Sequence, residues 1–279
     1  MSIKILVCGS AGFLMSNFLR YVFYRSKEFK IVSVDYFENP KSYPKLYKHN
    51  LHTFYLGNLC DKDFLSKLIE LEKPDFILNS ISCDELYDKI RVDFLQIFKN
   101  LYELQIPMMQ LIPSEKLDIL NLWGFLRKDN QVSETFINNG GLTLEIPNCF
   151  GMRQQYNKNI ECRFVNVIKN IIDDNDIVAS SKLVPWVFSE DVASFIWFLI
   201  EKRMSGFVQM PQLGYKSMCD MAKIAMETLG KKSNIITIPC FLDDEYSGNS
   251  IEEWIPDSIS LEKSVIKTVK WFDVNRWAL

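Results

Sequence analysis

The stretch Ile3-Lys-Ile-Leu-Val-Cys-Gly9-Ser-Ala-Gly12-Phe-Leu-Met15 decides the fold. Its apolar run from Ile3 to Val7 is typical of a parallel strand that is buried on both faces. Two closely spaced glycines follow the run, and apolar residues then recur at helical spacing. A strand, a glycine turn and a helix in this order leave backbone N–H groups at the helix N-terminus, where they can bind a pyrophosphate.

The first half of the sequence continues this alternation of short apolar runs and helical patterns. Asp61 is placed to cap one of the helices. Further strands are expected at residues 29–34, 52–56, 76–79, 108–112 and 142–146, and helices at residues 62–71, 85–104 and 120–137. Such alternation predicts βαβ units with right-handed crossovers. The expected fold class is therefore α/β, with a Rossmann-like doubly wound parallel sheet.

Asp35 ends the second expected strand and adds a second feature to the glycine turn. A carboxylate at this place can accept hydrogen bonds from both ribose hydroxyls of a dinucleotide, and it would repel a 2′-phosphate. The combination of Gly9, Gly12 and Asp35 therefore favours NAD over NADP. A plain strand–helix turn without a ligand is the alternative.

Past Gly151 the alternation becomes looser. Residues 242–256 are acidic and rich in turn formers, which predicts a surface loop. Helical patterns are found at residues 163–172, 190–202, 216–229 and 261–275. We therefore expect a dinucleotide-binding domain over residues 1–151 and a smaller C-terminal α/β substrate lobe over residues 152–279, with strands and helices that can be interleaved.

Composition and charge narrow the function classes. The 279 residues include 32 basic and 35 acidic ones, a formal net charge of -3, so neither nucleic acid nor an anionic membrane is expected as a partner. The longest apolar stretch, Val192–Ile200, is far shorter than the ~20 residues of a membrane span. The seven cysteines form no Cys-x-x-Cys pair and only two histidines are present, so no metal site is expected. Scattered cysteines without a signal peptide predict reduced thiols in a cytoplasmic protein.

Several further motifs resemble one family along nearly the whole sequence. Gly57-Asn-Leu-Cys-Asp61 follows the third expected strand, and Ile146-Pro-Asn-Cys-Phe-Gly151 ends the sixth. Trp186-Val-Phe-Ser-Glu-Asp-Val-Ala193 and Lys267-Thr-Val-Lys-Trp-Phe272 lie in the second half. With the glycine turn, these stretches resemble the extended short-chain dehydrogenase/reductases, and within them the nucleotide-sugar 4,6-dehydratases and 4-epimerases. The resemblance implies NAD as the cofactor, a nucleotide sugar as the ligand and a homodimer.

The resemblance also implies binding residues, position by position. Asn148 matches a position that contacts the pyrophosphate of the nucleotide sugar. Met15 departs from the family pattern because it stands where a third glycine is expected, so it should push the helix outward or occupy dinucleotide space and weaken binding. The implied cofactor-binding residues are Gly9, Ala11, Gly12, Phe13, Asp35, Asn58, Leu59 and Ser80.

The family's catalytic Tyr-x-x-x-Lys pair is replaced in this sequence. The matching stretch is Leu122-Trp-Gly-Phe-Leu-Arg127, so Trp123 takes the place of the tyrosine and Arg127 that of the lysine. An indole N–H donates a hydrogen bond but is neither an acid nor a base near neutral pH. An arginine can bond a ribose hydroxyl but does not exchange a proton. Trp123 can equally be a core aromatic residue.

The dehydratase Thr-Asp-Glu stretch corresponds to Ser114-Glu115-Lys116. Ser114 keeps the hydroxyl that bonds a sugar oxygen, and Glu115 stands in the place of the aspartic acid. Lys116 replaces the glutamate that removes a proton from the sugar, although Glu115 and Lys116 can equally form a solvated ion pair. Glu145 stands where the substrate-side strand usually has an arginine.

Two functions remain open on the sequence alone. The first is an NAD-using enzyme that oxidises a nucleotide sugar at C4 with an altered acid/base. The second is a pseudoenzyme that holds a nucleotide sugar or acts as a partner or scaffold subunit. Standard dehydratase or epimerase chemistry is expected to be weakened or absent because of the combined replacements at Met15, Lys116, Trp123 and Arg127.

Overall fold

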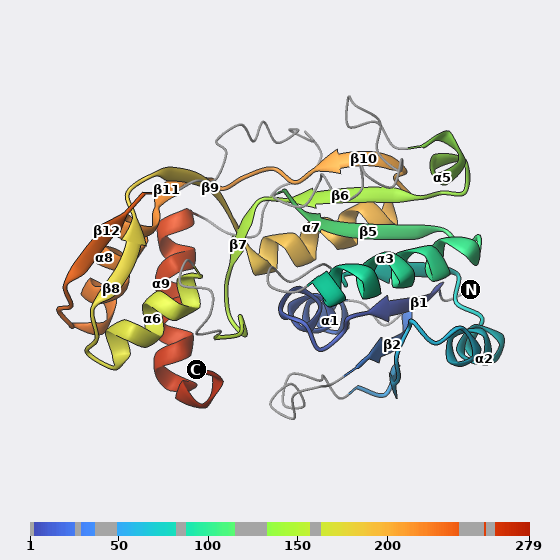
Figure 1. Cartoon of the computed structure of the whole chain (residues 1–279), viewed down its shortest axis with the longest axis horizontal. Coiled ribbons are helices and arrows are strands. Elements are labelled where there is room, and N and C mark those ends of the chain that lie inside the picture. Colours follow the sequence, from blue (N-terminus) through green and yellow to red (C-terminus); the bar gives the residue numbers. More distant parts are fainter. Residues whose placement is uncertain are drawn as a thin grey trace. The chain divides into compact units, whose positions relative to one another are not determined.

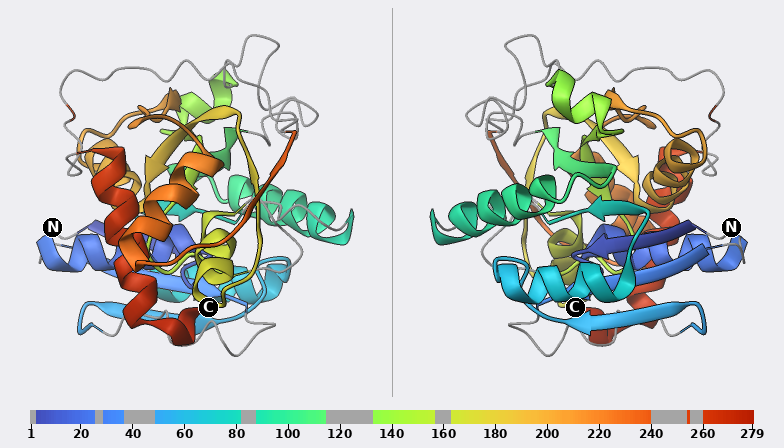
Figure 2. Two further views of the ribbon diagram at one scale, coloured as in Figure 1. Left: turned by 90° about the vertical axis from the view of Figure 1, so that its left-hand side faces the viewer. Right: turned by 90° about the vertical axis from the view of Figure 1, so that its right-hand side faces the viewer.

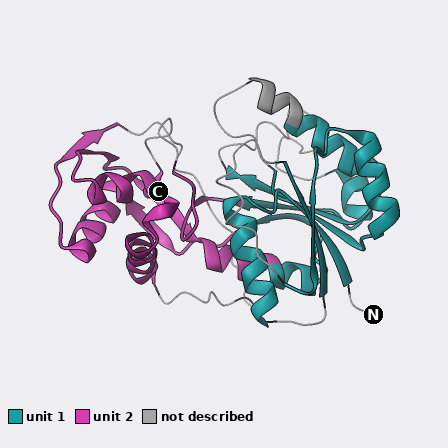
Figure 3. Ribbon diagram, turned by 90° about the horizontal axis from the view of Figure 1, so that it is seen from below, with its two compact units in different colours: residues 1–145, 197–209 teal, residues 146–196, 210–279 magenta. Residues whose placement is uncertain are grey.

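The protein divides into two compact units (Figure 3). The computed structural model describes residues 3–25, 29–36, 49–81, 88–114, 133–156, 163–239, 254 and 260–279. Unit 1 comprises Met1–Glu145 and Trp197–Gln209, and unit 2 comprises Ile146–Ile196 and Met210–Leu279. The segment Trp197–Gln209, which the sequence places in the C-terminal lobe, therefore groups with the N-terminal unit.

Unit 1 is built on a seven-stranded sheet in the order β10-β6-β5-β4-β1-β2-β3 (Figure 1). The strands are β1 (Ile3–Cys8), β2 (Phe29–Asp35), β3 (His52–Leu56), β4 (Phe76–Asn79), β5 (Met108–Pro113), β6 (Leu142–Ile146) and β10 (Gly206–Gln209). Neighbouring strands run parallel, for example β1 against β2 and β4. The chain winds outward from β1 in both directions, so the predicted doubly wound parallel sheet is confirmed.

Helices cover both faces of this sheet, as right-handed crossovers require (Figure 2). Helices α2 (Lys62–Glu72), α3 (Asp88–Glu103) and α5 (Glu134–Asn138) lie on one face. Side chains from these helices, including Leu65 and Phe98, form one buried cluster with Leu6, Ile77 and Met108 of the strands. Helix α1 (Phe13–Arg25) connects β1 to β2 and buries Phe18, Leu19 and Val22.

Local sequence signals place α2 as expected. The Asp61 carboxylate accepts hydrogen bonds from the N–H groups of Asp63 and Phe64 at 2.9 and 3.1 Å, which satisfies two donors at the helix start. The helix ends at Lys73, which takes the left-handed conformation at φ 46°. The predicted cap is confirmed.

Unit 2 combines small sheets with helices (Figure 1). One sheet has the order β11-β9-β7, from β7 (Asn148–Phe150), β9 (Leu183–Phe188) and β11 (Gly214–Ser217), and β8 (Ile177–Ser180) pairs with β12 (Ile235–Ile238). The helices include α6 (Phe164–Ile172), α8 (Met218–Leu229) and α9 (Leu261–Val274). One apolar cluster joins these elements, with Phe150, Phe164, Phe188, Met221 and Phe272 among its buried members.

The helical patterns of the second half are matched within a few residues by α6, α7 (Ser189–Glu201), α8 and α9. The division between the units falls inside α7. The strands β8 to β12 were not expected, because each has only four to six residues. Most of them, such as β10 and β12, show neither a continuous buried run nor strict alternation. The expected helix at 120–137 is described only in α5, and the expected loop at 242–256 lies outside the described residues except for Trp254.

In the described part of the chain, none of the helices combines the length and apolar character that crossing a membrane requires.

Candidate functional site

The glycine turn lies at the carboxyl end of β1, between β2 and β4. Gly9 takes a positive φ of 77°, and its N–H donates to the Val34 carbonyl oxygen at 3.0 Å. Gly12 N–H donates to the Gly9 carbonyl oxygen at 3.0 Å, and α1 begins at the next residue. The turn therefore delivers the start of α1 to the edge of the sheet where ligands of such folds bind.

Both glycines of the turn are needed for steric reasons. A Cβ at Gly9 would lie 2.8 Å from Ser80 Oγ and 3.1 Å from Ile81 Cγ1, and a Cβ at Gly12 would lie 3.0 Å from the Gly9 carbonyl oxygen. The Ser80 hydroxyl is held beside Gly9 because it donates a hydrogen bond to the Cys8 carbonyl oxygen at 2.9 Å. Ser80 thus supports the turn from the end of β4.

The N-terminus of α1 suits an anion. Its first turn, which begins at Phe13, contains no acidic residue of its own, and the partial positive charge of a helix N-terminus favours an anion. The Ser10 hydroxyl is buried and has no hydrogen-bond partner among the described residues. Met15 is fully buried, so its side chain faces protein rather than an open groove, and its expected effect on binding stays a prediction.

Asp35 is fastened to the glycine turn as well as to its own strand end. One carboxylate oxygen accepts from Ala11 N–H at 2.7 Å and the other from Tyr36 N–H at 2.8 Å. Burial raises the pKa of the Asp35 carboxyl above its ordinary value, and the two N–H donors oppose this shift. The contact between Asp35 and Ala11 was not foreseen, although both residues were assigned to the cofactor. Each oxygen keeps acceptor capacity for a ligand hydroxyl.

The turn that follows β3 adjoins Asp35, because Gly57 N–H donates to the Asp35 carbonyl oxygen at 3.1 Å. Asn58 is exposed in this turn, and its side-chain oxygen accepts from Cys60 N–H at 2.9 Å. Leu59 is buried among apolar side chains of unit 1. Asn100 of α3 donates its amide to the carbonyl oxygens of Leu59 and Cys60 at 3.0 and 3.3 Å and so holds the turn. Asn100 is about 40 positions away in the sequence, and the sequence pattern did not reveal this contact.

Two polar side-chain pairs that join neighbouring strands of unit 1 were also missed. Asn79, the last residue of β4, donates its amide to Gln110 Oε1 of β5 at 2.6 Å. Gln209, the last residue of β10, donates its amide to Glu145 Oε2 of β6 at 2.7 Å. Burial raises the pKa of the Glu145 carboxyl, and the amide of Gln209 lowers it in part.

The remaining predicted residues divide between described and undescribed parts of the chain. Ser114 directly follows β5 and is half-buried. Asn148 opens β7 in unit 2, and its amide donates to the Pro185 carbonyl oxygen at 3.3 Å. Glu115, Trp123 and Arg127 lie outside the described residues, so their assigned roles stay predictions.

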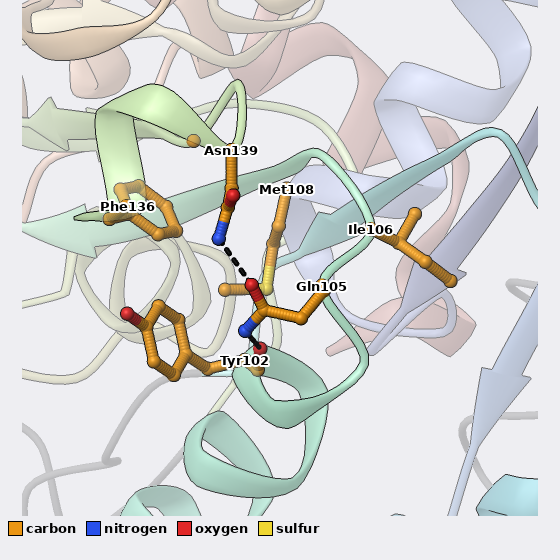
Figure 4. A pocket seen from close by; sticks show the side chains of 7 residues that line it. Tyr102, Gln105, Ile106, Met108, Phe136 and Asn139 are labelled. Atoms are coloured by element: carbon orange, nitrogen blue, oxygen red, sulfur yellow. Dashed lines mark hydrogen bonds between the residues drawn. The ribbon is translucent and has the colours of Figure 1, made fainter.

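A small pocket lies at the opposite edge of the unit 1 sheet (Figure 4). Tyr102 of α3, Phe136 of α5 and Met108 of β5 line it, together with Gln105 and Asn139, which follow the two helices. It has room for little more than one water molecule. Because it sits at the amino ends of β5 and β6, it is not the ligand site that the sheet topology predicts.

Comparisons with known proteins show which solved structures share this fold. No family model matches the sequence. A segment of 79 residues is 33% identical to the dTDP-D-glucose 4,6-dehydratase of Dictyostelium discoideum, which corresponds to 27% of this chain and 18% of that protein.

Solved structures match over almost the whole chain. The dTDP-glucose 4,6-dehydratase of Bacillus anthracis in complex with NAD gives a TM-score of 0.78 at 16% identity, over 99% of this chain and 98% of that one. The UDP-N-acetylglucosamine 4-epimerase of Methanobrevibacter ruminantium, in complex with UDP-N-acetylmuramic acid, gives 0.73 at 16% identity, over 99% and 100%.

The UDP-glucuronic acid 4-epimerase of Bacillus cereus in complex with NAD gives a TM-score of 0.72 at 15% identity, over 98% of this chain and 99% of that one. The structures of the B. anthracis and B. cereus proteins hold NAD. The chain thus has the fold of the extended short-chain dehydrogenase/reductases that its sequence motifs resemble.

Proposed function

We propose that this protein binds NAD at the glycine turn and acts on a nucleotide sugar, with the usual acid/base pair of such enzymes lost. The proposal rests on the 2.7 Å hydrogen bond that Ala11 N–H donates to the Asp35 carboxylate. This bond joins the glycine turn after β1 to the carboxyl end of β2. The acid that favours NAD is thereby held against the turn that can bind its phosphates.

The residues present fit the dinucleotide. The backbone from Gly9 to Phe13 is bare of Cβ atoms at the two positions where one would crowd the turn, and the start of α1 carries no acid. Phe13 N–H and the turn would hold the pyrophosphate, Asp35 the adenosine ribose, and Asn58 the adenine. Bound NAD would accept a hydride from a sugar carbon.

The standard chemistry of dehydratases and epimerases is weakened in this proposal. Trp123 and Arg127 stand where the family has its proton-exchanging pair, and neither side chain transfers a proton near neutral pH. Ser114 would still hydrogen-bond the sugar, and Glu115 is its acidic neighbour in sequence. Restoring tyrosine and lysine at 123 and 127 need not restore activity, because Met15 and Lys116 remain.

The substrate side of the proposal rests on Asn148 and on the fold. The epimerase of M. ruminantium holds a UDP-linked sugar, and Asn148 matches the family position that contacts the pyrophosphate of such ligands. A cytoplasmic homodimer is part of the same proposal. A pseudoenzyme that keeps the nucleotide sugar but performs no reaction is the second candidate, favoured by the loss of the family's tyrosine at Trp123.

The turnover experiment separates these two candidates. The protein is incubated with NAD and a panel of UDP- and dTDP-hexoses, and the near-ultraviolet absorbance of reduced nicotinamide and the sugar products are followed. Slow reduction or a converted sugar supports the enzyme. Binding of NAD and a nucleotide sugar without either change supports the pseudoenzyme, and binding of neither contradicts both.

Replacing Asp35 by asparagine should reverse the preference for NAD. An asparagine keeps an oxygen for Ala11 N–H but removes the charge, so NAD affinity should fall about tenfold and NADP affinity should rise. Calorimetric titrations with both dinucleotides measure this change. The control Asp63→Asn alters an exposed acid of α2 and should leave both affinities unchanged. Equal losses for both dinucleotides would show that Asp35 acts only by supporting the turn.

A further inference from the structure

Four neighbouring strands of unit 1 each carry a polar side chain, which is last or next to last in β4, β6 and β10 and lies mid-strand in β5. Asn79 and Gln110 are fully buried on β4 and β5, and Glu145 is 3% exposed on β6. Gln209 is half-buried on β10. Asn79 and Gln110 are register partners, as are Glu145 and Gln209. The strands follow one another in the order β10-β6-β5-β4, so the two pairs, together called the row, come from four successive strands.

The row lies on one face of the sheet. Alternate residues of a strand share a face, and Ile77 and Met108, each two residues before a member of the row, pack in the cluster formed with α2 and α3. Phe207, two residues before Gln209, packs against the same cluster. Because Glu145 is paired in register with Gln209, it also lies on this face, together with the buried Thr143 hydroxyl two residues earlier.

Glu145 is the acid of this row. The amide of Gln209 donates to its carboxylate at 2.7 Å, and the neutral Thr143 lies two residues earlier on the same face of β6. Burial is the first cause of its raised pKa. Groups that exchange protons in enzymes are often buried carboxyls whose pKa is shifted and which lie at a ligand-binding edge.

The location on the sheet agrees with such a role. In doubly wound sheets a dinucleotide extends across the carboxyl edge, one mononucleotide on each half. Asp35 ends β2 in one half, where the adenosine would bind. Glu145 lies in the other half, on β6, which neighbours β5 and the Ser114 that follows it. The reacting half of the cofactor would thus lie on the side of Glu145.

We propose that Glu145 takes up the proton when the sugar hydroxyl is oxidised, in place of the missing tyrosine. The O–H bond of the secondary alcohol breaks and its proton forms the O–H bond of the Glu145 carboxylic acid. The C–H electron pair leaves as a hydride to the bound NAD, and the carbon–oxygen bond becomes double. The inference rests on the proposed function, and it assigns Gln209 as the positioning residue that orients the carboxylate.

The protonation of Glu145 can be measured without turnover. Infrared difference titration of the protein, compared with Glu145→Gln, isolates the stretching band of this one carboxylic acid. The expected midpoint lies above the ordinary value of 4.5 for a glutamate. Gln209→Leu should move it higher, because the donated hydrogen bond that stabilises the carboxylate is removed. A midpoint at or below 4.5 in the wild-type protein would overturn the inference.

The turnover test uses the same variants. Glu145→Gln should lower kcat about a hundredfold and leave the affinities for NAD and the nucleotide sugar nearly unchanged, whereas Glu145→Asp should retain part of kcat. In Gln209→Leu the acidic limb of the pH profile of kcat, where activity is lost as Glu145 becomes protonated, should shift to higher pH together with the infrared midpoint. The matched control Glu70→Gln changes an exposed glutamate of α2 and should alter none of these.

The outcomes distinguish this inference from the function on which it rests. A wild-type protein that fails to bind NAD, or binds it without oxidising any nucleotide sugar, contradicts the proposed enzyme and the inference together. A wild-type protein that turns over while Glu145→Gln keeps full kcat contradicts the inference alone, and leaves the pair as a structural link between β6 and β10. If Glu145→Gln does not fold, the pH shift in Gln209→Leu decides: an unchanged profile overturns the inference.

Discussion

Replacing Gly9 by valine should abolish NAD binding and destabilise the protein by about 3 kcal/mol. The positive φ of 77° disfavours a residue with a Cβ by roughly 1–2 kcal/mol, and a β-branched side chain is especially poor there. The Cβ would also lie 2.8 Å from Ser80 Oγ, so the end of β4 or the turn must move. Movement of the turn displaces the N–H groups that would hold the phosphates.

Gly230→Val is the matched control for this variant. Gly230 ends α8 at φ 64°, and a Cβ built there meets nothing within 4 Å. Gly230→Val should therefore lose stability through the unfavourable backbone conformation alone, without steric crowding, and should leave NAD affinity unchanged. Denaturant unfolding and calorimetric titration of the two variants measure the contrast. Retention of wild-type NAD affinity in Gly9→Val would mean that the turn is not where NAD binds.

Replacing Phe150 by alanine should have the largest effect on stability, about 3–5 kcal/mol. Phe150 is fully buried in unit 2, and its ring lies 5.7, 5.9 and 5.6 Å from those of Phe164, Trp186 and Phe188. Removing it leaves a cavity at the centre of three aromatic contacts. The loss should appear in denaturant unfolding followed by tryptophan fluorescence.

The same variant tests the division of binding between the units. Asn148 lies two residues before Phe150 on β7, so Phe150→Ala should weaken nucleotide-sugar binding while NAD binding, assigned to unit 1, is retained. Val274→Ala removes an apolar side chain that is 82% exposed on α9, and should change stability by less than about 0.5 kcal/mol. Parallel loss of NAD and sugar affinity in Phe150→Ala would contradict the division.

Much of unit 1 could be predicted because its signals are local. A strand buried on both faces must be apolar at successive positions, as β1 and β2 are, and the glycine turn and the Asp61 cap follow from residues a few positions apart. Several strands of unit 2 lack this signal. β12, for example, is half-buried or exposed at every position, so neither continuous hydrophobicity nor strict alternation marks it.

The candidate site was only partly predictable for a related reason. Gly9, Gly12 and Asp35 could be named because the spacing of strand, turn and acid is a recurrent pattern. Glu145 and Gln209 are 64 positions apart, and only the register of β6 against β10 brings them together. Asn100 likewise reaches a turn 41 positions away. Such contacts depend on topology, which a single sequence does not specify residue by residue.

The central claim is that the turn and Asp35 together bind NAD. The most direct measurement is a calorimetric titration of the purified wild-type protein with NAD and, separately, with NADP. Saturable binding of NAD, at least about tenfold tighter than that of NADP because of the Asp35 charge, is the predicted result. Absence of NAD binding at millimolar concentration, or tighter binding of NADP, would contradict the account.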